Sequence, residues 1–124
     1  MAIQSYRDLT VWQDAIALAT VLYRLTANFP KDELYGQTKI RRAGVSVAAN
    51  IAEGRGRETT KLFIQFLRTA QGSLKEVETH LIIAEQVALL DRQALDSHLL
   101  QCESLGKRLR ALIRTLQDKV GRDE

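Results

Sequence analysis

Apolar residues recur every three or four positions along four stretches of the chain, and this spacing gathers side chains on one face of an α-helix. The longest seam carries Phe63, Leu67, Leu74 and Leu81 on one such face. Unbroken seams of this kind are typical of long helices that pack at shallow angles in a bundle. The pattern predicts four helices, over residues 11–28, 34–53, 60–89 and 92–119.

Residues that start and stop helices stand between these stretches. Thr10 followed by Gln13 predicts a capping box at the start of the first helix, and Pro30 is expected to end it. Gly54 is expected to end the second helix in a left-handed conformation, and Asp91 to cap the fourth. Because only a tight turn precedes Asp91, the last two helices should form an antiparallel hairpin. The expected fold is an all-α, antiparallel up-and-down four-helix bundle, with residues 1–124 as one domain.

Two glycines, Gly72 and Gly106, fall inside the long helices. Glycine costs about 1 kcal/mol relative to alanine in a helix interior, so each position needs a reason. We expect a neighbouring helix to approach closely at both glycines, with a functional role as the less favoured alternative.

Composition narrows the class of protein. The chain has 124 residues, of which 45% are hydrophobic and 27% charged, as in soluble globular proteins. Its single cysteine excludes an internal disulfide framework. The start of the chain lacks a secretory apolar core, and the apolar run Ala15–Tyr23 is shorter than the roughly 20 residues of a membrane span. We therefore expect a cytoplasmic protein with no membrane partner.

Charge is distributed unevenly along a chain whose formal net charge is +3. Basic residues are in excess over residues 39–70 and 107–124, with an acidic zone between them. Such zones favour phosphate groups, above all where the Gly54–Thr59 turn leads into a helix N-terminus. The alternative is that these cations are solvated or compensate helix ends, and no aromatic residue is interleaved with them to stack on bases. The candidate nucleic-acid-binding residues are Arg41, Arg42, Arg55, Arg57, Lys61, Arg68, Arg108, Arg110 and Arg114.

Motifs for catalysis or metal binding are incomplete. The Gly54–Thr59 turn lacks the Gly-Lys-Ser/Thr of a P-loop, and His80 and His98 lack the Glu-x-x-His spacing of di-iron bundles. Glu76 and His80 are four residues apart, which suits a metal pair or, as we favour, a surface salt bridge. We expect no enzyme activity, no metal and no cofactor.

Three polar residues, Ser46, Asn50 and Glu53, share one face of the second predicted helix. No histidine accompanies them, so a nucleophile–base pair is not indicated. We interpret them as a structural polar cluster that fixes helix register. Cys102 lies on the apolar seam of the last helix, where we expect a buried small side chain.

A set of short segments in the first three-quarters of the chain forms a recognisable pattern. They are Tyr6–Trp12, Phe29–Pro30, Tyr35–Gly36, Ile40–Ser46, Asn50–Arg57, Phe66–Leu67, Ala70–Leu74 and Glu76–Glu78. In these segments the sequence resembles the 23S rRNA intervening-sequence proteins, a family of four-helix bundles. It departs from the family pattern at Ala48, where proline is frequent, and at Leu62, where an acidic capping residue is common.

The resemblance implies a bundle that assembles into a ring, typically a homopentamer, and it implies no enzyme activity. The sequence is also similar to the accessory proteins of diversity-generating retroelements, pentamers that bind nucleic acid and a reverse transcriptase. Independently, Val11, Leu18 and Leu25 form a second apolar stripe on the first helix, which we expect a single bundle to leave exposed. Both arguments predict a homo-oligomer.

Two function hypotheses follow. In the first, the oligomer is a non-enzymatic module that binds structured RNA or DNA through its basic surface. In the second, the protein is a structural adaptor whose arginines pair with Glu53, Glu76 or Glu78 to hold the oligomer together, and which binds a protein partner.

Overall fold

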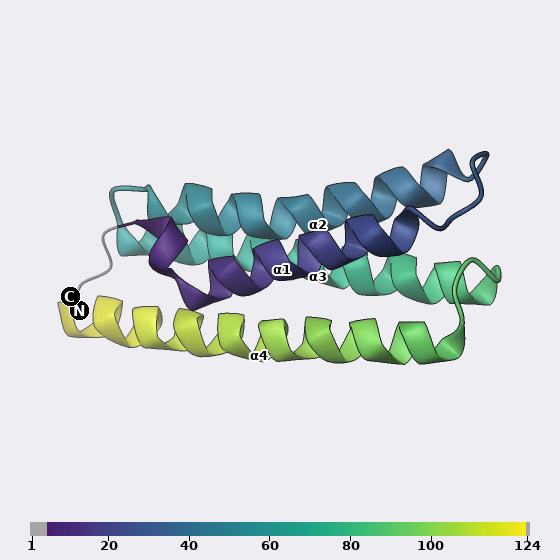
Figure 1. The fold of residues 1–124 in the computed structure, drawn as a ribbon. Helices are drawn as coiled ribbons and strands as arrows, with labels where there is room; N and C mark the ends of the chain where they lie inside the picture. The colour runs from purple at the N-terminus through teal and green to yellow at the C-terminus, as the bar shows by residue number, and fades with distance from the viewer. Residues whose placement is uncertain (1–4, 124) are drawn as a thin grey trace.

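The computed structural model describes residues 5–123 as four long α-helices preceded by one short helical turn (Figure 1). Consecutive helices run in opposite directions, and each packs on its neighbour in the sequence. No strand occurs in this part of the chain, so the prediction of an all-α four-helix bundle is confirmed. The elements are the 3-10 helix η1 (Tyr6–Asp8) and the α-helices α1 (Thr10–Thr26), α2 (Leu34–Arg55), α3 (Thr60–Gln86) and α4 (Arg92–Asp123).

The core runs the length of the bundle and is built from the predicted seams. Leu18, Val47, Leu67 and Leu109, one from each long helix, are fully buried. The α2–α3 pair packs most extensively, whereas α1 and α4 touch at few points. The bundle is therefore closed tightly around α2 and α3 and loosely between its first and last helices.

The prediction for the second apolar stripe of α1 was wrong. Val11 and Leu18 are buried inside the bundle, and Leu25 is half-buried against the core. The apolar side chains that α1 exposes are Ile16 and Tyr23, at 40% and 46%. The core-facing sector of α1 is simply wider than one seam, so the exposed apolar face lies on the other side of the helix.

The helix N-caps agree with the sequence at α3 and α4 and differ from the prediction at α1. Asp91 accepts a hydrogen bond from the Ala94 N–H at 2.7 Å, which confirms it as the cap of α4. The predicted capping box at Thr10 was wrong, because the η1 turn places Leu9 at the N-cap position with no side-chain acceptor. The Gln13 amide donates instead to the Arg7 carbonyl at 2.9 Å. At the start of α3, the Thr59 hydroxyl accepts from the Leu62 N–H at 3.1 Å.

Gly54 does not end α2 in a left-handed conformation, so that prediction was wrong as well. The helix continues to Arg55, and Gly54 is buried against α3. A Cβ atom at this position would lie 2.6 Å from the Cβ of Phe66, closer than two carbons can approach. Gly54 is therefore required by the contact between α2 and α3 rather than by a turn.

Helix α3 ends three residues before the predicted limit of 89. The left-handed residue that follows it is Ala88, with φ of 64°. The Leu89 N–H donates to the Ala84 carbonyl at 2.8 Å and closes the end of the helix. This conformation is sterically unfavourable for alanine, because of its Cβ atom, and not for glycine.

Candidate nucleic-acid interface

The predicted polar cluster lies between α2 and α3. The Asn50 amide donates to the Ser46 carbonyl at 2.8 Å and to the Ser46 hydroxyl at 3.0 Å. The Ser46 hydroxyl lies 2.8 Å from that of Ser73, a buried residue on α3 that sequence analysis missed. Glu53 is exposed and lies outside this group. Two of the three predicted residues thus join a partner from the neighbouring helix.

Two of the candidate arginines tie helices together. Arg41 is half-buried, and its Nε donates to the buried Thr26 hydroxyl at 2.8 Å. Its guanidinium also stacks 4.5 Å from the centre of the Tyr23 ring, so α2 is fastened to the end of α1. Arg108 on α4 forms an ion pair with Asp14 on α1. We therefore leave Arg41 and Arg108 out of the proposed interface.

The basic turn between α2 and α3 meets the end of α4 at one end of the bundle (Figure 1). Arg55 from the end of α2, Arg57 and Glu58 from the turn and Lys119 from α4 line a single cavity of about 540 Å³ there. Thr59 and Thr60, at the start of α3, line it as well. We call these cations and the start of α3 the basic end. The up-and-down topology explains the meeting, because it returns α4 to the end where α2 stops.

The Arg57 guanidinium is held over an aromatic ring. It lies 4.7 Å from the centre of the Phe66 ring on α3. A cation–π contact of this kind orients an exposed guanidinium without consuming its N–H donors. Arg57 is therefore positioned to donate to an oxyanion at the basic end.

A second group of cations faces the groove between α3 and α4. Arg68 and Lys75 are seven residues apart on α3, and Lys61 is a further seven residues back, so the three share one face. On α4, positions 107, 110 and 114 also share a face by helical spacing. Lys75, Lys107 and Arg110 line one cavity between the helices, which shows that the two faces meet. We call the following set the α3–α4 basic groove: Lys61, Arg68, Lys75, Lys107, Arg110 and Arg114.

Lys75 was missed because it lies in the zone where acidic residues are in excess. The spacing of seven from Lys61 through Arg68 was the signal that could have found it. Arg42 is exposed on the other side of the bundle, where it lines a shallow hollow between α1 and α2 with Tyr23. Of the nine predicted cations, the structure thus brings Arg55 and Arg57 to the basic end and Arg110 to the α3–α4 cavity. Helical spacing assigns Lys61, Arg68 and Arg114 to the basic groove.

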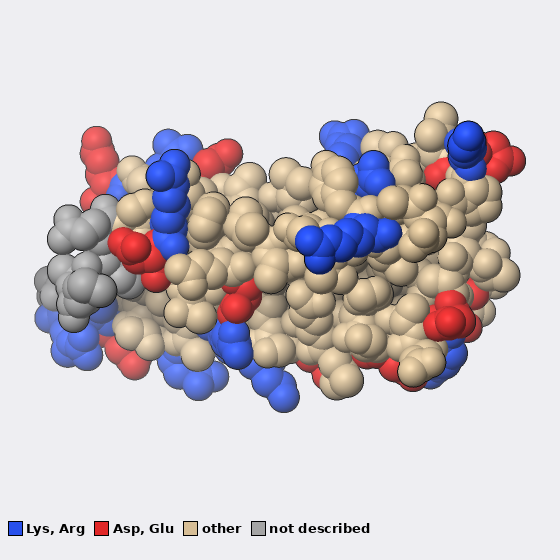
Figure 2. Space-filling model, viewed as in Figure 1, with Lys and Arg blue, Asp and Glu red and all other residues tan. Residues whose placement is uncertain are grey.

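An apolar hollow of about 260 Å³ lies between α1 and α2. Its lining includes Trp12, Ile16, Val45 and Ala49, and Ile16 and Val45 are 40% and 45% exposed. Figure 2 shows an uncharged area over part of α1 on this face, bordered by basic and acidic side chains. We call these four residues the α1–α2 apolar patch.

The structure defines a small all-α bundle with cations gathered at one end and along one groove. Among residues 5–123, no helix has both the length and the apolar character needed to cross a membrane. Within the same residues, no group of three His, Cys, Asp or Glu side chains is placed to hold a metal ion.

The sequence profile of the family of 23S rRNA-intervening sequence proteins matches residues 7–111. The chain belongs to this family, which confirms the resemblance found in the sequence.

Among solved structures, the bundle is similar to the crystal structure of a protein of unknown function from the S23 ribosomal protein family of Bacteroides thetaiotaomicron. The TM-score is 0.77 at 23% identity, over 84% of this chain and 98% of the other. At that identity the likeness speaks for the fold alone. A comparison with curated proteins finds no match.

Proposed function

We propose that this protein is a nucleic-acid-binding module that holds phosphates of structured RNA or DNA at its basic end and along its α3–α4 basic groove. The observation that carries the proposal is the convergence of Arg55, Arg57 and Lys119 on one cavity beside the start of α3. Guanidinium groups bind phosphate oxygens in pairs, and a helix N-terminus adds partial positive charge. The groove extends the same charge along the bundle.

The proposal includes self-association through the α1–α2 apolar patch. Ile16 and Val45 are exposed beside Trp12, and contiguous apolar surface of this kind marks an interface. The family resemblance implies a ring, typically of five copies. Five chains of net charge +3 would give a ring of about +15, and several weak phosphate contacts would then act together.

The direct test is titration of a fluorescently labelled RNA hairpin, and of a DNA duplex, followed by anisotropy. The variant Arg57→Ala with Lys119→Ala removes two cations from the basic end. The matched control, Arg24→Ala with Lys31→Ala, removes two exposed cations from the opposite end. We expect the first pair to weaken binding at least about tenfold and the second to leave it nearly unchanged. Absence of binding by the unaltered protein to both nucleic acids would reject the proposal.

The second candidate function is the structural adaptor. Its support is limited to one chain, where Arg41 and Arg108 hold helices together. If the basic-end variant lowers the mass of the oligomer measured by light scattering, and no nucleic acid binds, the arginines hold subunits together. If the mass is unchanged and RNA binding is abolished, the adaptor hypothesis fails.

A further inference from the structure

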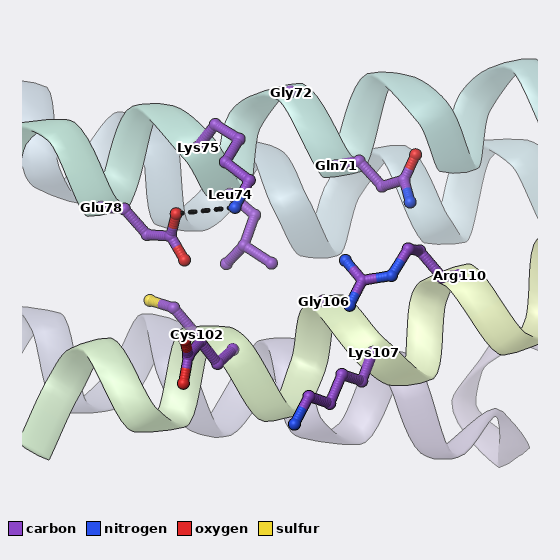
Figure 3. A pocket seen from close by; sticks show the side chains of 10 residues that line it. Gln71, Gly72, Leu74, Lys75, Glu78, Cys102, Gly106, Lys107 and Arg110 are labelled. Carbon is purple, nitrogen blue, oxygen red and sulfur yellow. Dashed lines mark hydrogen bonds and ion pairs between the residues drawn. The ribbon is translucent and has the colours of Figure 1, made fainter.

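A cavity of about 400 Å³ opens between α3 and α4, near the middle of both helices (Figure 3). Its size is in the range of pockets that bind small molecules. Leu74 and Cys102, which are 2% and 0% exposed, lie at its inner side. Two glycines, Gly72 and Gly106, line it from facing helices.

The glycines do not have the role that the sequence predicted for them. A Cβ atom at Gly72 would meet no atom within 4 Å in the described chain. At Gly106 it would meet Leu74 at 3.6 Å and Arg110 at 3.8 Å, which are ordinary contacts. The expected close approach of helices is therefore wrong at Gly72 and not required at Gly106. Gly72 is exposed on α3, so of the two glycines only Gly106 faces Leu74 across the space between α3 and α4.

The charges around this space are only partly paired. The Lys75 ammonium lies 3.0 Å from the Glu78 carboxylate, so these two charges satisfy each other. Lys107 and Arg110 form no ion pair within residues 5–122, and Glu103 is the one lining carboxylate left to them. In Figure 3 the Arg110 side chain runs along α4 toward Gly106, where a Cβ atom would lie 3.8 Å from its Nη1. Arg110 thus stands at the mouth of the cavity, and in Figure 3 the Lys107 side chain points away from α3.

The inner side of the cavity does not oppose a negative ligand. Burial, reinforced by the charge of Glu78, raises the pKa of the Cys102 thiol to about 12. The thiol is therefore protonated and neutral at pH 7, and beside Leu74 it offers an apolar surface. An entering molecule would meet cations at the mouth and uncharged groups beneath them.

We propose that the α3–α4 cavity binds a small organic anion, with its negative group on Arg110, to which the long Lys107 side chain can turn, and its apolar body over Leu74 and Gly106. Lys107 and Arg110 also belong to the α3–α4 basic groove, where nucleic acid would compete with a small anion, but the site shares no residue with the basic end.

The test uses two fluorescent naphthalene probes that differ in charge. 1-Anilinonaphthalene-8-sulfonate carries a sulfonate, and N-phenyl-1-naphthylamine has the same rings without it. Gly106→Leu adds volume to the cavity from a position where a Cβ atom makes only ordinary contacts, and Gly121→Leu, at an open position near the end of α4, is the matched control. We expect Gly106→Leu to weaken both probes at least about tenfold, because it occupies their volume, and Gly121→Leu to change neither.

The charge half of the proposal is tested by Lys107→Ala with Arg110→Ala. We expect this pair to weaken the sulfonate probe at least about tenfold and the neutral probe less than about threefold. Equal weakening of both probes would overturn the assignment of the cations to the anionic group.

Two results would overturn the site itself. If both probes bind Gly106→Leu as tightly as the unaltered protein, they bind elsewhere, the α1–α2 apolar patch being the obvious place. If Gly106→Leu changes the oligomeric mass while Gly121→Leu does not, the cavity receives a neighbouring copy of the chain and not a small molecule. The RNA titration is a separate experiment. If the probes fail to bind the cavity, the proposed nucleic-acid function still stands, and if RNA fails to bind, the cavity proposal still stands.

Discussion

Helix α3 makes two contacts whose glycines have opposite structural effects. Against α2, Gly54 allows the Phe66 turn of α3 to come so near that a single added carbon would clash at 2.6 Å. Against α4, Gly106 lies beside a cavity of about 400 Å³, and a Cβ atom there would make only ordinary contacts. The α2–α3 contact is also joined by the Ser46–Ser73 hydrogen bond, whereas the α3–α4 contact is rimmed by charge. A glycine inside a helix therefore indicates missing volume, and only the neighbour decides whether a helix or a ligand uses it.

The largest expected loss of stability comes from a substitution that forces α2 and α3 apart. Gly54→Ala places a methyl group against Phe66 and Phe63, which lie on the buried side of α3. We expect a decrease of about 1–3 kcal/mol in the free energy of unfolding, measured with urea, because the two helix backbones must separate. Gly121→Ala, where nothing lies within 4 Å, is the control and should not destabilise. An equally stable Gly54→Ala variant would break the comparison.

The hydrogen bonds between α2 and α3 should carry the next largest effect. Ser73→Ala removes a buried hydroxyl and leaves that of Ser46 with one partner fewer. We expect a decrease of about 1–2 kcal/mol in the free energy of urea unfolding. Thr79→Ala removes an exposed hydroxyl of the same helix, which donates only to the Lys75 carbonyl, and should change stability by less than about 0.5 kcal/mol. Similar decreases for both variants would mean that the cluster does not stabilise the contact.

A substitution at Gly72 should instead raise the free energy of unfolding. Gly72→Ala adds a methyl group into open space and removes the helix penalty of glycine. We expect a gain of about 1 kcal/mol, or about 4 °C in Tm for a domain of this size. A decrease in stability would mean that a neighbouring backbone does approach Gly72, as the sequence alone suggested.

A smaller effect, of the same kind, is expected where α3 ends. Ala88→Gly relieves the left-handed conformation at φ of 64° and should raise stability by about 0.5–1 kcal/mol. Thermal unfolding of this variant, compared with Ala111→Gly on an exposed part of α4, separates relief of strain from the ordinary cost of glycine in a helix. If both variants are destabilised alike, the turn is not strained.

The thiol at the α3–α4 cavity gives a pH-dependent test. Because burial raises the pKa of Cys102 to about 12, the folded thiol keeps its proton where the unfolded thiol, with a pKa near about 8.5, loses it. The contribution of the protonated Cys102 thiol to the free energy of unfolding is therefore complete below about pH 8.5 and disappears as the pH rises toward 12. We expect a disulfide reagent at about pH 8 to react with the unfolded chain and hardly with the folded one. Rapid reaction of the folded chain would mean that Cys102 is accessible from the cavity.

Hydrophobic periodicity was enough to predict the four helices and their order, since the seams through Leu67 and Leu109 continue without a break. The convergence of Arg57 with Lys119 follows from up-and-down topology once the helices are placed. The role of Gly54 could not be predicted, because its fit depends on where Phe66 lies on another helix. The contact of Arg41 with Thr26 and Tyr23 was hidden for the same reason. Sequence spacing locates a residue on its own helix, whereas its partner depends on how two helices pack.

The salt dependence of RNA binding tests the central claim most directly. Removing one cation that binds a phosphate should reduce the slope of log K against log salt by about 0.9 for a duplex. If the basic end binds phosphates, Arg57→Ala with Lys119→Ala should reduce this slope by about 2, and Arg24→Ala with Lys31→Ala should leave it unchanged. Equal slopes for the unaltered protein and the basic-end variant would contradict the account.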